Sequence, residues 1–314
     1  MTMRTVLVLG ATGGVGGAVT RAMLARGWRV TALARDPARS AKAWGLSDAP
    51  DWRSGDAMNR AEVVGAAEGA SVIVHAVNPA GYRGWDRLVL PMLDNTLAAA
   101  RAAGARVVLP GTIYNYDPAT ASTIDETTPQ RPRGRKGAIR VEMERRLAEA
   151  APEVRSLIVR AGDFFGPGAG QSWFAQALAK RPLTRIVNPG TPGVGHAFAF
   201  LPDLAEVIAR LIELPSDRLL PCERLQFPGH DLSEMGEMVA AIRRASGRPD
   251  LPERRFPWGV MRALAPFGGF PHEVMEVRPF WTHPVRLDER RLTELLGDGP
   301  CTSLDAAVAA ALRP

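Results

Sequence analysis

The stretch that decides the fold is Thr5-Val-Leu-Val-Leu-Gly10-Ala-Thr-Gly13-Gly-Val-Gly16-Gly-Ala-Val19. Its apolar start, Thr5 to Leu9, predicts a strand buried on both faces, and a helical pattern follows the glycines. Glycines at 10, 13 and 16 allow a tight turn, a close approach of backbone N–H groups to a pyrophosphate, and close packing of helix on strand. The order of strand, glycine turn and helix therefore predicts a dinucleotide site, and the alternative is a glycine turn without a ligand. The residues expected to contact the dinucleotide here are Gly10, Thr12, Gly13, Gly14, Val15 and Gly16.

The alternation of strand and helix continues through the first half of the chain. Short apolar runs at 29–34, 71–76, 106–109 and 155–160 predict further strands. Helical stretches lie between them, such as 16–26 and 91–103, each followed by a glycine that can end a helix. Because strands that alternate with helices form parallel βαβ units, the expected class is α/β, with a doubly wound parallel sheet of the Rossmann type.

After Gly162 the pattern changes, since Gly and Pro divide the chain into loops. Ser303 then predicts the N-cap of a last, alanine-rich helix. We expect a dinucleotide-binding domain at 1–163 with a return segment at about 197–222. A smaller mixed C-terminal substrate lobe is expected at 164–196 and 223–314.

Composition narrows the range of functions. With 46% hydrophobic and 23% charged residues among 314, the chain has the composition of a soluble globular protein. Its apolar runs are too short to cross a bilayer, so we expect a cytoplasmic protein without a membrane partner. The two cysteines, Cys222 and Cys301, lack metal-ligand spacing, and no metal site is expected. The net charge of +6 comes from arginines spread along the chain, so we expect an anionic small molecule as ligand and no nucleic acid.

The end of the second predicted strand bears on the choice of cofactor. An acidic residue about 20 positions after the glycine motif binds the ribose hydroxyls of NAD, whereas an arginine there accommodates the additional phosphate of NADP. Here Arg35 and Asp36 are adjacent. Arg35 is nearer the strand, and Asp36 can form an Asx turn before Pro37, so NADP is favoured and NAD is the alternative.

Taken together, these motifs resemble the short-chain dehydrogenase/reductase superfamily, in its extended or atypical epimerase/reductase branch. The segments that carry the resemblance are the glycine turn, Gly55-Asp56, Val72 to Val77, Asn95, Val107 to Tyr116, Arg160 to Gly168 and Phe200 to Ala205. The resemblance implies that Asp56 contacts adenine, that Ala76 and Val77 run beside the cofactor, and that Thr112 is the catalytic Ser or Thr. It also implies a homodimer.

The resemblance fails at its centre, where the superfamily has a Tyr followed four residues later by a Lys. Neither Tyr82, Tyr114 nor Tyr116 is followed by lysine at that spacing. In this chain, Lys136 stands at the position of that Tyr and Arg140 at the position of that Lys. Lys136 is expected to donate a proton and Arg140 to hold the cofactor, because arginine stays protonated. The alternative is an Arg140–Glu144 ion pair on a solvated helix, with Lys136 exposed.

Tyr114 and Tyr116 follow Thr112 closely, so either can replace the missing phenol; packing is the alternative for both. Among the histidines, His75 fits a satisfied strand residue, and His196 is the better candidate to line a pocket.

The function expected from these residues is reduction of a small carbonyl compound or an activated alkene, with NADP as cofactor. Thr112, Lys136 and Tyr114 are the expected catalytic residues. An enzyme alternative is a nucleotide-sugar epimerase or dehydratase. A second class is a non-catalytic sensor of the dinucleotide, because a degenerate enzyme would also lack the Tyr–Lys pair.

Overall fold

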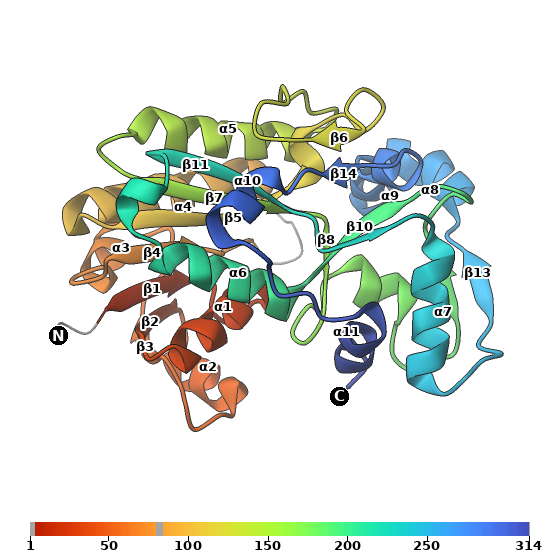
Figure 1. The fold of residues 1–314 in the computed structure, drawn as a ribbon, viewed down its shortest axis with the longest axis horizontal. Helices are drawn as coiled ribbons and strands as arrows, with labels where there is room; N and C mark the ends of the chain where they lie inside the picture. The colour runs from red at the N-terminus through yellow and green to blue at the C-terminus, as the bar shows by residue number, and fades with distance from the viewer. Residues whose placement is uncertain (1–3, 80–83, 314) are drawn as a thin grey trace. The chain divides into compact units, whose positions relative to one another are not determined.

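The computed structural model of the chain describes residues 4–79 and 84–313 (Figure 1). Tyr82 lies outside the described residues. The described residues form two compact units. The first comprises the residues up to Gly111, Glu142–Val159 and Ala205–Leu225, and the second comprises Thr112–Val141, Arg160–Leu204 and the residues from Gln226 onward.

A seven-stranded sheet is the centre of the first unit. Its strands are β1 (Thr5–Leu9), β2 (Arg29–Ala34), β3 (Asp51–Ser54), β4 (Val72–His75), β5 (Arg106–Thr112), β7 (Ser156–Ala161) and β11 (Cys222–Phe227). They lie in the order β11-β7-β5-β4-β1-β2-β3, and β1 pairs in parallel with both β2 and β4. The direction of winding therefore reverses between β1 and β4, which is where doubly wound sheets bind ligands. The expected α/β class and Rossmann-type sheet are confirmed.

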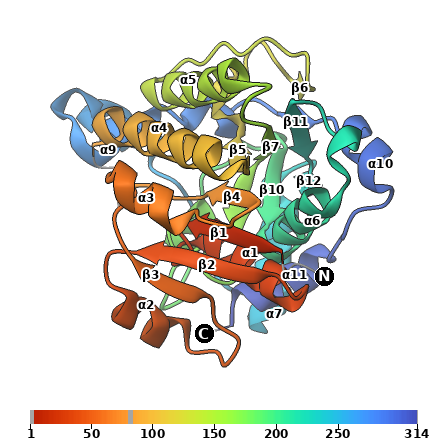
Figure 2. The ribbon, with the colours of Figure 1, turned by 90° about the vertical axis from the view of Figure 1, so that its left-hand side faces the viewer.

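Helices cover both faces of this sheet. They are α1 (Gly14–Ala25), α2 (Pro37–Trp44), α3 (Arg60–Ala66), α4 (Trp85–Ala103), α5 (Arg135–Ala150) and α6 (Leu201–Glu213). Figure 2 shows α4 and α5 on one face and α1 and α6 on the other. Ion pairs join the members of each layer: Arg26, at the end of α1, reaches Glu206 and Glu213 on α6.

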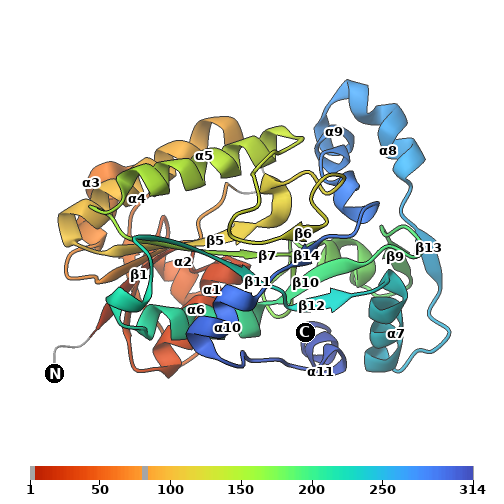
Figure 3. The same ribbon diagram turned by 45° about the horizontal axis from the view of Figure 1, so that its top comes forward.

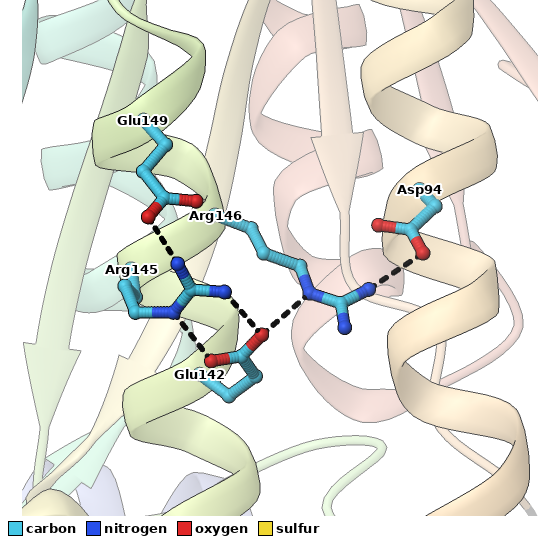
Figure 4. A network of polar contacts seen from close by, with 5 residues as sticks. All are labelled: Asp94, Glu142, Arg145, Arg146 and Glu149. Atoms are coloured by element: carbon cyan, nitrogen blue, oxygen red, sulfur yellow. Dashed lines mark hydrogen bonds and ion pairs between the residues drawn. The ribbon is translucent and has the colours of Figure 1, made fainter.

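The contact between α4 and α5 is a network of charges (Figure 4). Glu142 accepts hydrogen bonds from Arg145 at 2.6 Å and from Arg146 at 2.8 Å, and Arg146 also reaches Asp94 on α4 at 2.6 Å. Hydrogen bonds from the two guanidinium groups lower the pKa of Glu142 to about 2. The carboxylate therefore stays charged at any pH near neutrality and holds Arg146, which in turn pairs with Asp94 on α4.

Three elements differ from the expectations. The strands β3 and β11 were not expected, because Asp51–Ser54 and Cys222–Phe227 are too polar to give a buried-strand pattern. Helix α4 begins at Trp85 rather than at Pro91, so proline lies inside it, and the preceding residues are helical despite the lost N–H. The predicted helix end at Gly104 is confirmed, with a left-handed C-cap there.

Three small sheets and several helices build the second unit. The sheets are β8 (Asp163–Phe165), β10 (His196–Phe200) and β12 (His230–Leu232); β9 (Ile186–Asn188) and β13 (Glu253–Arg255); and β6 (Thr123–Ile124) and β14 (Arg286–Leu287). The helices are α7 (Met235–Ser246), α8 (Trp258–Leu264), α9 (Gly269–Met275), α10 (Arg290–Leu296) and α11 (Leu304–Ala311). Figure 3 shows α8 beside α9 and α7 beside α11. The expected smaller mixed sheet is thus confirmed in β12-β10-β8, as is Ser303 as the N-cap of α11.

The second unit begins earlier in the chain than the expected boundary at 163. Its segment Thr112–Val141 leaves the sheet after β5 and packs with late residues, because it is apolar on one side. The cluster consists of Ile113, Tyr116, Ile124, Phe280, Val285 and Leu287.

Candidate functional site

The glycine turn joins β1 to α1 in the first unit. Gly10 has φ +91°, a conformation that side chains rarely adopt, and a Cβ there would lie 2.5 Å from the carbonyl oxygen of Ala76. A Cβ at Gly16 would lie 2.2 Å from the carbonyl oxygen of Gly10. Gly10 and Gly16 are thus required by the protein's own backbone, which brings α1 close to the ends of β1 and β4.

Gly13 has a different role. Its φ of −88° is open to any residue, and the nearest heavy atom to an added Cβ is 3.3 Å away. Gly13 is the N-cap of α1, is exposed, and supplies no capping side chain; the first turn contains no acidic residue. The first N–H groups and the positive end of the helix dipole are therefore available to an anion, such as the pyrophosphate of a dinucleotide.

The other predicted cofactor residues of this unit lie at the carboxyl ends of neighbouring strands. Arg35 follows β2 and is exposed; among the described residues it makes no hydrogen bond or ion pair. The adjacent Asp36 caps α2, because its Oδ1 accepts a hydrogen bond of 2.9 Å from the N–H of Arg39. One of the two carboxylate oxygens is therefore already used within the protein, whereas the guanidinium is available for a phosphate.

Asp56 and the segment after β4 complete this edge. Asp56 is half-buried and accepts a hydrogen bond of 2.9 Å from the N–H of Met58. The N–H of Ala76 donates to Leu9 at 3.0 Å, and Ala76 and Val77 lie against Gly10. Contact of these three residues with a cofactor stays a prediction. Asn95 instead binds the carbonyl of Ala57 at 2.9 Å.

In the second unit, Thr112 and Tyr114 are held by a short turn directly after β5. The Thr112 hydroxyl accepts a hydrogen bond of 2.9 Å from the N–H of Tyr114, and so caps the 3-10 turn Ile113–Asn115. The Tyr114 hydroxyl in turn donates to Oδ1 of Asp163, at 3.0 Å. Thr112 thus positions the backbone of Tyr114, and Asp163 positions its hydroxyl.

Asp163 is a site residue that the sequence did not single out, except within a longer motif. It begins β8, and its Oδ2 lies 2.7 Å from Nε2 of His196 on β10. The side chain of Asp163 is 12% exposed and that of His196 is 3% exposed. The prediction that His75 is a strand residue is confirmed: it is buried at the end of β4, and its Nδ1 lies 2.8 Å from the buried Thr96 hydroxyl.

Lys136 lies in the first turn of α5 and is 9% exposed, so the alternative of an exposed lysine is wrong. Its Nζ lies 2.7 Å from Oε2 of Glu273 and donates to the Glu273 carbonyl at 3.1 Å. Burial opposes the charge of Glu273, but the hydrogen bond from Lys136 and its charge dominate and lower the pKa of Glu273. Lys136 therefore joins α5 to α9 as a charged group.

The same helix turn brings Lys136 near Tyr114. A Cβ at Gly137 would lie 2.1 Å from the Tyr114 carbonyl oxygen. The first turn of α5 therefore packs directly against the turn after β5 that carries Tyr114. Tyr114 and Lys136 line one cavity together with Tyr116, Glu276 and Phe280, and its volume of about 10 Å³ is that of about one water-sized molecule. Arg140, the predicted cofactor anchor, is half-buried one turn further along α5. The roles of Lys136 and Arg140 stay predictions.

The contacts of Lys136 allow a test of its role. We expect Lys136→Met to lower the free energy of unfolding by about 1–2 kcal/mol, because it leaves Glu273 without its ammonium partner. Stability from the lowered pKa of Glu273 is present near neutrality and lost as the pH falls through that pKa, so this part of the acid dependence should become smaller in the variant, in which Arg135 still pairs with Glu273 at 3.1 Å. Urea unfolding at several pH values measures both effects. Should turnover also fall by 10²- to 10⁴-fold, the proton-donor role would be supported; unchanged turnover would restrict Lys136 to joining the two helices.

The comparisons with known proteins agree with this arrangement. Residues 10–153 match the family model described as NAD(P)H-binding. A curated relative, the 3-diazoavenalumate denitrifying reductase of a Streptomyces species, is 31% identical over 181 residues, or 52% of this chain. The chain spans 58% of the length of that relative.

Solved structures match nearly the whole chain. The L-threonine dehydrogenase of Clostridium difficile has a TM-score of 0.75 and 17% identity, over 99% of this chain and 97% of that one. The UDP-glucose 4-epimerase of Bifidobacterium longum, in complex with NAD+ and UDP, has a TM-score of 0.74 and 17% identity, over 98% and 97%. MoeE5, in complex with UDP-glucose and NAD, has a TM-score of 0.73 and 19% identity, over 98% and 97%.

Within the described part of the chain, no helix has the length and apolar character needed to span a membrane. Residues 10–153 are similar to NAD(P)H-binding domains, which agrees with a nicotinamide dinucleotide as the cofactor, and the chain shares its fold with an L-threonine dehydrogenase and a UDP-glucose 4-epimerase.

Proposed function

We propose that this chain is an NADP-dependent reductase of a small carbonyl compound or an activated alkene. The observation that carries the choice of NADP is the pair at the end of β2, where Arg35 is exposed and Asp36 caps α2. The reductase activity is supported by the curated relative, which is named as a reductase. When bound, the reduced cofactor supplies a hydride.

The protein's part in this reaction is to hold the dinucleotide and to control a proton. The first turn of α1 binds the pyrophosphate, and Arg35 binds the 2′-phosphate. Tyr114, which Thr112 and Asp163 orient, donates the proton that the substrate oxygen needs after hydride transfer. Lys136 holds α5 near Tyr114.

The second candidate is an epimerase or dehydratase acting on a nucleotide sugar. It is favoured by the nucleotide-sugar complexes among the structural neighbours, but disfavoured here because a carboxylate accepts the proton of Tyr114. A carboxylate acceptor stabilises the neutral phenol, whereas those reactions need a phenolate that takes a proton from a sugar hydroxyl. The third candidate, a dinucleotide sensor, requires binding without turnover.

One experiment separates the three candidates. NADPH oxidation is followed at 340 nm with ketones, aldehydes, enones and aromatic diazo compounds, and sugar nucleotides are analysed for epimers in the presence of NAD+. We expect oxidation of NADPH by at least one of the small acceptors. Tight binding of NADPH with no reaction in the whole panel would favour the sensor and contradict the reductase.

The NADP preference has its own test. Arg35→Ala should weaken binding of NADPH by about tenfold to a hundredfold, since a charge-assisted hydrogen bond contributes about 1.5–3 kcal/mol. Binding of NADH should change little, because NADH lacks the phosphate. Calorimetric titration measures both, with Lys42→Ala on the following helix, α2, as a control for the loss of one positive charge. Equal losses for both dinucleotides in Arg35→Ala would contradict the assignment.

A further inference from the structure

His196 is buried, with 3% of the residue exposed, and it contacts Asp163 of the candidate site. Both of its ring nitrogens face an atom that can accept a hydrogen bond. Nε2 faces the Asp163 carboxylate at 2.7 Å, and Nδ1 faces the carbonyl oxygen of Phe280 at 3.1 Å. The ring of Trp281 stacks on the imidazole, with centroids 3.8 Å apart and planes 6° apart. The imidazole is therefore fixed in position and shielded from water.

These contacts determine how many protons the pair carries. A carbonyl oxygen only accepts, so Nδ1 carries a hydrogen. Between Nε2 and Oδ2 of Asp163 there must then be one more, either on the nitrogen as imidazolium with carboxylate or on the oxygen as carboxylic acid with neutral imidazole. In both forms the pair shares one proton and has no net charge, and in both Oδ1 accepts the hydrogen of Tyr114.

From this geometry, and on the basis of the proposed reductase function, we infer that Tyr114, Asp163 and His196 form a proton relay that replaces the missing Tyr–Lys pair. Tyr114 is the catalytic residue that contacts the substrate oxygen. Asp163 and His196 are positioning residues that act through Tyr114 and restore its proton.

The relay works when the pair takes up one more proton from solvent at Asp163, whose side chain is 12% exposed. Asp163 then donates from Oδ1 to the Tyr114 oxygen, while His196 is an imidazolium that donates from Nε2 to Oδ2. As the substrate carbon gains its hydride, the Tyr114 proton passes to the substrate oxygen, the Oδ1 proton passes to Tyr114, and the Nε2 proton passes to Oδ2. Three bonds to hydrogen break and three form, and His196 ends as a neutral imidazole.

Few other titratable groups are near the pair. The elements packed against β10 are β8, β12, β14 and the turn Arg278–Trp281. Besides Asp163, their titratable or charged residues are His230, Asp231, Arg278 and Arg286. Asp231 is ion-paired with Arg286 at 2.7 Å, and burial lowers the pKa of His230. Asp163 is thus the acidic group that directly contacts His196.

The relay predicts a pH dependence that depends on these three residues. In the wild type, kcat/KM for reduction should fall about tenfold per pH unit above the pKa at which the pair takes up its additional proton. Tyr114→Phe should lower turnover by about 10²- to 10⁴-fold. Asp163→Asn and His196→Gln should each lower it by at least about tenfold and remove the pH dependence, with NADPH affinity within about threefold of wild type.

A control variant accompanies them. His230→Gln removes a half-buried histidine from the neighbouring strand and should keep the wild-type profile. A readout that needs no turnover is nitrogen NMR of the His196 ring, assigned by its loss in His196→Gln. It should show a hydrogen on Nδ1, and Tyr114→Phe should shift the Nε2 signal, which reports the proton shared with Asp163.

The outcomes separate the relay from the function. A wild type that reduces none of the acceptors overturns the proposed function and the relay with it. Reduction by the wild type with an unchanged pH profile in Asp163→Asn and His196→Gln overturns the relay alone, as does an Nδ1 without hydrogen.

Discussion

Replacing Gly13 with valine is expected to abolish binding of NADPH and NADH while the chain stays folded. The backbone conformation at Gly13 allows a side chain, since its φ is −88°, and an added Cβ would lie 3.3 Å from the Gly10 carbonyl oxygen, so the turn has to shift only slightly to accept it. A side chain there points into the space at the exposed N-terminus of α1, where the pyrophosphate of a dinucleotide would approach. Affinity should fall by more than about a hundredfold, which corresponds to about 2.7 kcal/mol.

The measurement is a calorimetric titration of both dinucleotides, together with urea unfolding of the same protein. Gly65→Val is the matched control, because an added Cβ on Gly65 meets no atom within 4 Å and lies away from the turn. Affinity that survives in Gly13→Val would mean that the dinucleotide does not lie on α1. If Gly13→Val also lowered the free energy of unfolding so far that the chain was unfolded, the loss of affinity would contradict the prediction that the valine only blocks the pyrophosphate site.

The first unit could be predicted from the sequence because its signals are local. The apolar residues of β1 and β2 are contiguous, and Gly10 follows β1 directly. The strands that were missed lie at the edges of the sheet, β3 beside β2 and β11 beside β7. An edge strand needs less apolar surface, so a polar segment such as Asp51–Ser54 can form one.

The candidate catalytic residues could be predicted only in part, since their partners are distant in the sequence. The motif that contains Thr112 is local, and the turn after β5 places Tyr114 beside it. Asp163, however, meets His196 because β8 pairs in parallel with β10, with Asp163 opposite Phe198. Lys136 likewise meets Glu273 on a helix that had no sequence signal. Neither pairing has a periodicity from which it could be inferred.

Replacing Gly10 with alanine is expected to unfold much of the chain, because two separate costs fall on one residue. A side chain at φ +91° strains the backbone by about 1–3 kcal/mol. The added Cβ would also lie 2.5 Å from the Ala76 oxygen and 2.8 Å from Cα of Val77. Both are backbone atoms of the segment directly after β4, so no rotation of a side chain can relieve the overlap. We expect a total loss of about 4 kcal/mol or more, a large part of the 5–15 kcal/mol typical of a folded domain.

Gly104→Ala separates the two costs of Gly10→Ala. Gly104 has φ +64°, but an added Cβ there meets no atom within 4 Å, so only the strain remains and the loss should be about 1–2 kcal/mol. Urea unfolding of both variants, each compared with the wild type, gives the difference. That difference is the free energy lost through the steric overlap of the added Cβ with Ala76 and Val77. If the two variants lost the same stability, the segment after β4 would lie further from Gly10 than the structure places it. The crevice at the reversal of the sheet, where the dinucleotide is proposed to bind, would then be wider.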